Sequence, residues 1–246
     1  MSPRQMTDHE PTESELLRCE NIAKRFGGME VLSGISFSVS SGEILGIIGP
    51  NGAGKTTLME VLAGLLPRDS GTLFWQNRPL AALESRKSLF YIPDGILPYA
   101  DDRVENVLQF FQGIYAAGNE RFELLIDRLG LGNVLKKTVQ SLSKGYRRRL
   151  LLAIGLLSPQ PLLMLDEPFD GFDLRQTLGI MALLRETLAE RTLLLSIHQL
   201  SEAEKICDRY ILLSEGALVA EGTMGELRRQ AGLQDGGLEE VFLALV

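Results

Sequence analysis

The segment Gly49-Pro-Asn-Gly-Ala-Gly-Lys-Thr-Thr57 constrains the fold of this chain more than any other stretch. It has the spacing G-x-x-x-x-G-K-[ST], which forms a loop around phosphate groups between a strand and a helix. The flanking sequence supplies that context. Residues 43–48 are an apolar run typical of a buried strand, and residues 57–66 repeat apolar side chains at helical spacing. A chance glycine-rich turn would explain neither flank, so the chain is predicted to hold a nucleoside triphosphate.

Each residue type in the loop has a physical role toward a triphosphate. Gly52 and Gly54 let successive backbone N–H groups turn toward the anion, and the following helix points its positive dipole end at it. Lys55 adds a mobile positive charge for the β- and γ-oxygens, and the hydroxyl of Thr56 is a ligand for Mg²⁺. The residues expected to bind the nucleotide in this loop are Gly49, Pro50, Asn51, Gly52, Ala53, Gly54, Lys55, Thr56 and Thr57.

Size, charge and apolar content exclude several classes of protein. With 246 residues and 45% hydrophobic content, the chain can bury a substantial core. Its longest nearly uncharged apolar stretch, residues 150–157, is far shorter than the roughly 18 residues of a membrane span. Residues 1–16 lack the features of a signal peptide and are expected to form a disordered leader. A net charge of −7 argues against nucleic acid as the main partner.

The order of patterns along the chain predicts an α/β fold: a P-loop NTPase core with a mostly parallel sheet flanked by helices. Residues 17–49 alternate in polarity between Gly and Ser turns, which favours an N-terminal antiparallel β subdomain. Between about 95 and 158, two apolar stripes at helical spacing indicate an inserted helical subdomain. From residue 162 onward, predicted strands and helices alternate, as in a parallel sheet covered by helices.

A second segment, residues 162–167 (LLMLDE), is predicted to complete the site. Four apolar residues fit a strand buried on both faces, and the carboxylates follow where that strand ends, at the edge where open α/β sheets bind ligands. Asp166 is placed there to hold Mg²⁺, and Glu167 to polarise an attacking water as general base. A simple turn with a helix cap is the alternative, which the phosphate loop disfavours.

With these motifs, the chain resembles the nucleotide-binding subunit of ATP-binding cassette (ABC) transporters over residues 17–246. Further matches follow in the family's order, although the L-S-G-G-Q signature is only partly matched. They are the signature segment Leu142-Ser143-Lys144-Gly145-Tyr146, the aspartate loop Asp170-Gly171-Phe172-Asp173, His198 after the next strand, and Phe26 before Gly27-Gly28. The resemblance implies ATP and Mg²⁺ as cofactors, Asp173 in the loop between subunits, His198 as a γ-phosphate sensor and Phe26 stacked on adenine.

The resemblance also implies partners and a location. Two ATPase subunits, identical or different, would pair head to tail, so that each ATP lies between one subunit's phosphate loop and the other's signature. Ser143 fits a helix N-cap, which would give the signature helix an anion-binding end. A separate transmembrane permease would hold the subunit at the cytoplasmic face of the cell membrane. Lys144 and the ending 238–243 resemble exporter-type subunits.

Three of these residue groups also have plainer explanations. A lone histidine at a strand end is more often a packing or surface residue, and so is an aromatic residue such as Phe26 near a hairpin. The run Arg147–Arg149 by itself fits a solvated basic face, because charge runs usually face water. Order along the chain favours the functional interpretation for His198 and Phe26.

Asp94 is the main departure from the family pattern. It follows residues 89–92, a predicted strand, at the place where the family carries Gln or, less often, Glu. An ionised aspartate only accepts hydrogen bonds, is shorter than glutamine and adds a negative charge near the metal. We therefore expect Asp94 to contact Mg²⁺ or the attacking water through an added water molecule.

These features predict an ATP hydrolase that powers a separate permease. Two alternatives remain open: a soluble cassette ATPase that serves assembly or repair without a membrane partner, and a nucleotide sensor that binds ATP without hydrolysing it. The transported substrate and the direction of transport are not encoded in these residues, because the substrate pocket would belong to another polypeptide.

Overall fold

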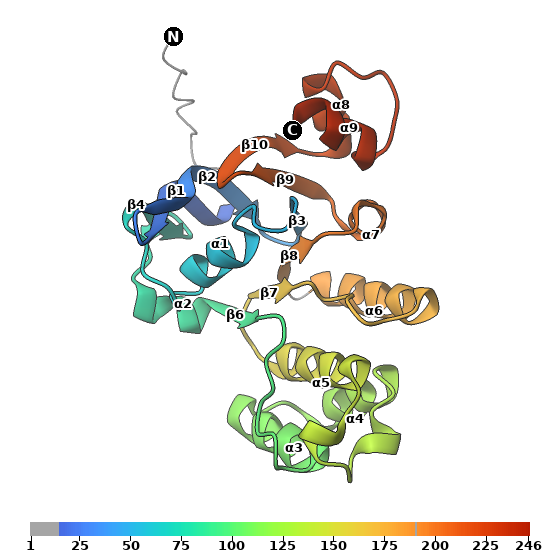
Figure 1. Ribbon diagram of the computed structural model, residues 1–246. Coiled ribbons are helices and arrows are strands. Elements are labelled where there is room, and N and C mark those ends of the chain that lie inside the picture. The colour runs from blue at the N-terminus through green and yellow to red at the C-terminus, as the bar shows by residue number, and fades with distance from the viewer. Residues whose placement is uncertain (1–14, 190) are drawn as a thin grey trace.

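A six-stranded sheet forms the centre of the computed structural model, which describes residues 15–189 and 191–246 (Figure 1). The strand order is β10-β9-β3-β8-β7-β6, and every neighbouring pair is parallel except β10 with β9. The strands are β3 (Ile44–Ile48), β6 (Leu89–Ile92), β7 (Leu162–Asp166), β8 (Thr192–Ile197), β9 (Arg209–Ser214) and β10 (Ala217–Gly222). The predicted mostly parallel sheet is confirmed.

A second, antiparallel sheet of four strands has the order β2-β1-β4-β5. Its strands are β1 (Glu15–Phe26), β2 (Met29–Ser40), β4 (Ser70–Trp75) and β5 (Arg78–Pro79). The predicted N-terminal β subdomain corresponds to this sheet. β1 starts at Glu15 and Leu16 is buried, so the strand begins before residue 17, where the domain was expected to begin. Residues 1–14, which make up the rest of the expected leader, lie outside the described residues.

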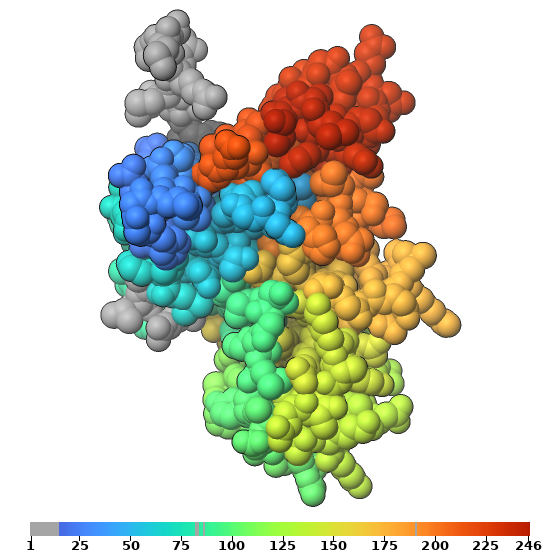
Figure 2. Space-filling view, viewed as in Figure 1, coloured from blue at the N-terminus to red at the C-terminus, as the bar shows by residue number. Residues whose placement is uncertain are grey.

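Helices surround the six-stranded sheet and form a separate lobe. Around the sheet lie α1 (Lys55–Leu62), α2 (Ala82–Ser88), α6 (Leu174–Glu186), α7 (Leu200–Ile206), α8 (Met224–Gln230) and α9 (Leu238–Leu245). The lobe contains α3 (Val104–Tyr115), α4 (Asn119–Arg128) and α5 (Lys144–Leu157), with short 3₁₀ turns at Gly132–Val134 and Val139–Ser141. Figure 2 shows this lobe, in green and yellow, as a distinct mass below the body. The elements β10, α2, α8 and α9 were not anticipated from the sequence.

The central strands separate two apolar layers. Along β3, Ile44 and Ile48 face one core cluster, while Leu45 and Ile47 face the other. This alternation follows from the two-residue period of a strand, and it explains why all five residues of β3 are buried. Both cysteines, Cys19 and Cys207, are buried as free thiols. Of the described helices, none is long and apolar enough to traverse a bilayer.

Leu195 offers a test of this core, because its side chain is fully buried in β8. Leu195→Ala leaves a cavity beside the central strands and is expected to lower the free energy of unfolding by about 2–5 kcal/mol. Leu243→Ala, at a position that is 75% exposed, serves as the matched control and should change it by less than about 0.5 kcal/mol. Urea unfolding of both variants measures the difference, and equal losses would contradict this placement of the core.

Candidate functional site

The phosphate loop joins the end of β3 to the start of α1. Gly54 is the N-cap residue of α1 and has a left-handed φ of 97°. A Cβ atom there would lie 2.9 Å from the Val31 carbonyl oxygen and 2.9 Å from the Leu32 side chain. Gly54 is therefore required both by its backbone conformation and by the close approach of β2. The resulting turn leaves the first N–H groups of α1 without helical partners, as an anion-binding helix end requires.

Lys55 extends its side chain back along the loop. Its Nζ donates to the carbonyl oxygens of Gly49 at 2.8 Å and Pro50 at 3.3 Å. The same Nζ lies 3.9 Å from Oε1 of Glu167, and the side chain is only 7% exposed. The ammonium group is thus held by two neutral acceptors beside one carboxylate, where it can exchange these partners for phosphate oxygens.

Asp166 connects the phosphate loop to the sheet edge. Its Oδ2 accepts a hydrogen bond from the Thr56 hydroxyl at 2.8 Å and from the Tyr91 hydroxyl at 3.3 Å. Its Oδ1 accepts a hydrogen bond from the hydroxyl of Ser196, which lies opposite Asp166 on β8. Burial raises the pKa of the Tyr91 hydroxyl above its usual value of 10, and the charge of Asp166 adds to the effect, so Tyr91 remains a donor.

Glu167 and His198 meet at the same edge. His198 Nδ1 lies 2.5 Å from Oε2 of Glu167, and the His198 backbone N–H donates to that oxygen at 3.3 Å. Glu167 has a left-handed φ of 49°, which is uncommon for a residue with a side chain. Its N–H donates to the backbone oxygen and the hydroxyl of Ser196, both at 3.2 Å. These bonds offset a local backbone cost and aim the carboxylate between Lys55 and His198.

These groups border one cavity with a volume of about 350 Å³. Its described lining residues are Val31, Asn51, Gly52, Gly54, Lys55, Thr56, Thr57, Asp94, Asp166 and Glu167. Most of the residues predicted from the two central motifs therefore face a common space. Phe26 is not among the described lining residues. It is 47% exposed at the end of β1, so its stacking on adenine stays a prediction.

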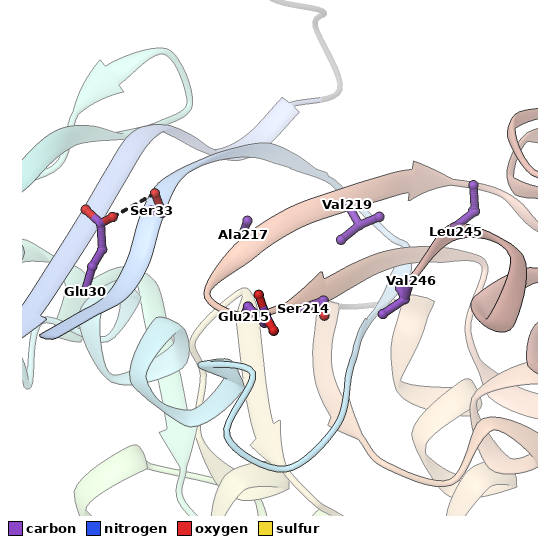
Figure 3. A pocket seen from close by; sticks show the side chains of 8 residues that line it. All are labelled: Glu30, Ser33, Ser214, Glu215, Ala217, Val219, Leu245 and Val246. Atoms are coloured by element: carbon purple, nitrogen blue, oxygen red, sulfur yellow. Dashed lines mark hydrogen bonds between the residues drawn. The ribbon is translucent and has the colours of Figure 1, made fainter.

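A second hollow differs in its charge. Figure 3 shows it between β2, the β9–β10 turn and the end of α9. Among the described residues that line it are two carboxylates, Glu30 and Glu215, and no Lys or Arg. Glu30 already accepts a hydrogen bond from Ser33 at 3.1 Å. A lining of carboxylates with no Lys or Arg disfavours a triphosphate, so the cavity at the phosphate loop is the nucleotide-site candidate.

The signature segment begins α5 as expected. Ser143 is the N-cap residue, and its hydroxyl accepts a hydrogen bond from the Tyr146 N–H at 3.4 Å. Gly145 lies beside the aspartate loop, since a Cβ there would be 3.4 Å from the Gly171 carbonyl oxygen. No residue of Ser143–Tyr146 is among the described residues that line the cavity. The signature is thus placed away from its own phosphate loop.

The aspartate loop contacts the signature within the same chain. Lys144 Nζ lies 2.5 Å from Oδ2 of Asp170, so the lysine that replaces the family's glycine has an acidic partner. Asp173 is the N-cap residue of α6 and accepts hydrogen bonds from the backbone N–H and the side-chain amide of Gln176, both at 2.8 Å. Both loops therefore have defined conformations in the single subunit.

Asp94 has a partner that the sequence did not indicate. Its Oδ1 lies 2.5 Å from Nη2 of Arg148, on α5. The Arg148 side chain is 5% exposed, so the expected solvated basic face is wrong for this member of the run Arg147–Arg149. Ser196 and Tyr91 were also missed. Ser196 could have been found as a polar residue inside an apolar strand beside the strand that ends in Asp166.

The residues at the sheet edge fit a magnesium ion. Mg²⁺ prefers oxygen ligands and is held by one or two carboxylates together with phosphate oxygens and water. The Thr56 hydroxyl and the Asp166 carboxylate already meet at 2.8 Å beside the cavity, which provides such oxygens on one side of the phosphate position. No group of three or more His, Cys, Asp or Glu residues that could hold a metal without phosphate occurs in the described residues.

The contact between Lys144 and Asp170 predicts a pH dependence. The hydrogen bond from Lys144 holds the pKa of Asp170 below its ordinary value of 3.8. The contact therefore contributes to stability above pH 3.8 and is lost as the pH falls through the lowered folded-state pKa. Carbon NMR titration of the Asp170 carboxyl should show this pKa rising toward 3.8 in Lys144→Met and staying low in Lys144→Arg. An unchanged pKa in Lys144→Met would disprove the pairing.

Comparisons with known proteins agree with this geometry. The ABC transporter family model matches residues 32–170. The lipopolysaccharide export system ATP-binding protein LptB of Escherichia coli is 32% identical over 238 residues, or 92% of this chain and 96% of that protein. The Nod factor export ATP-binding protein I of Burkholderia lata is 38% identical over 210 residues, or 82% of this chain and 69% of that protein.

A solved structure gives the same result for the fold. The ATP-binding subunit of an ABC transporter superposes with a TM-score of 0.85 at 29% sequence identity, covering 94% of this chain and 99% of that chain. The two central motifs, their shared cavity and these relatives together assign the family. The chain belongs to the ABC transporter family, as an ATP-binding and ATP-hydrolysing subunit that powers a transmembrane permease.

Proposed function

We propose that this ATPase works in an exporter, as one of two paired subunits at the cytoplasmic face of the cell membrane. One observation carries the proposal. Lys55, Asp166 and Glu167 line a single cavity, and none of the described signature residues lines it. The export functions named for LptB and for the Nod factor protein support the direction of transport. The described helices lack a membrane span, which agrees with attachment through a permease.

In the proposed reaction, the phosphate loop binds the triphosphate through its N–H groups and the Lys55 ammonium. Glu167 orients a water for in-line attack on the γ-phosphorus and accepts one of its protons, and ADP leaves as the β–γ bridging bond breaks. His198, at 2.5 Å from Glu167, would hold that carboxylate in position and sense the γ-phosphate. Bound Mg²⁺, held by Thr56 and Asp166, would neutralise charge on the phosphate oxygens.

Pairing of subunits would complete the site. The N-terminal end of α5 has unpaired N–H groups, and its N-cap Ser143 is exposed. In a head-to-tail dimer this end would contact the γ-phosphate held by the partner's phosphate loop, with the Asp173 loop between the two sites. The negative charge of ATP would then lie between two positive helix ends and hold the two subunits together.

An exposed aromatic patch fits the permease. We define the lobe patch as Tyr99, Phe110 and Ile114, which are 50%, 49% and 58% exposed. Tyr99 and Phe110 are in edge contact, with ring centroids 5.5 Å apart. Exposed aromatic residues in a cluster are typical of protein interfaces. The patch adjoins the segment that starts at Asp94, so a docked permease would contact a segment that also lines the nucleotide cavity.

Glu167→Gln tests the catalytic assignment. The variant should still bind ATP and dimerise, because the amide keeps the shape of the side chain, but turnover should fall by about 100-fold or more with the loss of the general base. Glu202→Gln is the matched control, because this second carboxylate lies on α7 close enough to be affected by the Glu167 charge. Phosphate release and size-exclusion chromatography with ATP supply the two readouts. Equal turnover in unmodified protein and Glu167→Gln would remove Glu167 from this role.

Phe110→Ser tests the permease surface. Removing the ring should weaken partner binding by about tenfold, the loss typical of an interface anchor, and leave ATPase activity of the isolated subunit unchanged. Leu124→Ser is the matched control, because Leu124 is 52% exposed on α4 but lies outside the lobe patch. Co-purification with the co-expressed permease and permease-stimulated ATPase activity measure the effect. Normal stimulation of Phe110→Ser would refute this docking site.

A further inference from the structure

Arg148 connects three parts of the nucleotide site. It lies on α5, the helix that begins at the signature, and its side chain is nearly enclosed. One guanidinium nitrogen lies 2.5 Å from Oδ1 of Asp94, after β6, and the other donates to the backbone carbonyl of Asp166, at the end of β7, at 3.1 Å. A single side chain thus holds together the signature helix and two loops that border the cavity.

The charge of Asp94 creates a problem for a triphosphate site. Asp94 lines the same cavity as Lys55 and Asp166, and its side chain is 49% exposed. With Asp166 and Glu167, it brings a third carboxylate to a space that must accept several phosphate charges. Like charges in a confined site oppose binding, and the effect is stronger where solvent is partly excluded.

Arg148 has the position and the charge to offset that carboxylate. A buried guanidinium needs an acidic partner, and Asp94 is the carboxylate that it contacts. The second bond, to the Asp166 carbonyl, fixes the guanidinium in a defined orientation, because the planar fork of arginine binds two acceptors at once. The neighbouring Arg147 and Arg149 bond instead to the carbonyl oxygens of Gln140 and Leu129, within the helical lobe.

From this geometry we infer that Arg148 is a positioning residue for ATP binding: it neutralises Asp94 and holds it against the signature helix, so that the cavity accepts a triphosphate. Arg148 acts through Asp94 and does not itself contact the nucleotide. The pair Asp94–Arg148 thereby takes the place of the neutral glutamine that the family pattern carries after β6. This inference rests on the proposed nucleotide site.

The test compares the affinity of four proteins for Mg²⁺ and the non-hydrolysable analogue AMP-PNP by calorimetry. Arg148→Gln leaves the Asp94 charge uncompensated and should weaken binding by about tenfold or more. Asp94→Asn alone removes the repulsive charge itself, so it should weaken binding less than Arg148→Gln does. The double variant, Asp94→Asn with Arg148→Gln, should return to within about twofold of the unmodified protein, because the repulsive charge is gone. A purely structural role for Arg148 would give a double variant at least as weak as Arg148→Gln.

Two further variants sharpen the result. Arg147→Gln, on the same helix but bonded within the lobe, should bind like the unmodified protein. The loss in Arg148→Gln should also shrink as salt is raised, because added ions screen the exposed carboxylate. If Arg148→Gln does not fold, Arg148→Lys replaces it. This variant keeps the positive charge beside Asp94 but loses the planar fork, so it should bind more weakly than the unmodified protein, and unchanged affinity would count against the role of Arg148.

The outcomes separate the inference from the function on which it rests. If the folded, unmodified protein does not bind AMP-PNP, the proposed nucleotide site is wrong. If the unmodified protein binds AMP-PNP, two results would overturn the role of Arg148 and leave the nucleotide site intact. One is equally tight binding by Arg148→Gln, and the other is a double variant that does not recover.

Discussion

The parallel pairing of β3, β8 and β7 is the constraint on which the site depends. In this register Ile48 lies beside Ile197, and Asp166 lies beside Ser196. Three strands therefore end at one edge, and the phosphate loop meets Asp166, 110 positions after Thr56 in the sequence. The hydrogen bonds from Thr56 and Ser196 to Asp166 then join the phosphate loop to that edge. A slip of one residue in β7 would turn the Asp166 side chain to the opposite face of the sheet.

The central site could be predicted because its chemistry depends on residue types at fixed spacing. The phosphate loop specifies its own turn, and residues 162–167 place two carboxylates at the end of a buried strand. Both predictions rest on local rules for glycine conformation and strand burial. His198 was placed by its order after the next strand, and it lies 2.5 Å from Glu167. The stacking of Phe26 on adenine and the contact of Asp94 with Mg²⁺ stay predictions, because the protein chain alone does not test them.

The pairing of Asp94 with Arg148 could not be predicted from spacing, because 54 residues and the helical lobe separate the two side chains. Helical spacing does not single out Arg148 either, because residues 150–157 of α5 are all buried and each arginine of the run has buried residues three and four positions later. Arg147 and Arg149 project to other sides of α5. A charge run was therefore a poor guide here, because helical periodicity assigns consecutive residues to different environments.

The separation of the signature from its own cavity has a physical consequence for the whole subunit. Lys55 and the N-terminal end of α1 provide positive potential at the cavity, while Asp94, Asp166 and Glu167 line the same space with carboxylates. The γ-phosphate of a bound ATP would therefore face solvent on a side where its own chain offers few donors. The N-terminal end of α5 carries the positive end of its helix dipole and so attracts the γ-phosphate. In the proposed dimer, ATP favours contact between these two surfaces, and its hydrolysis to ADP removes the charge that attracts them.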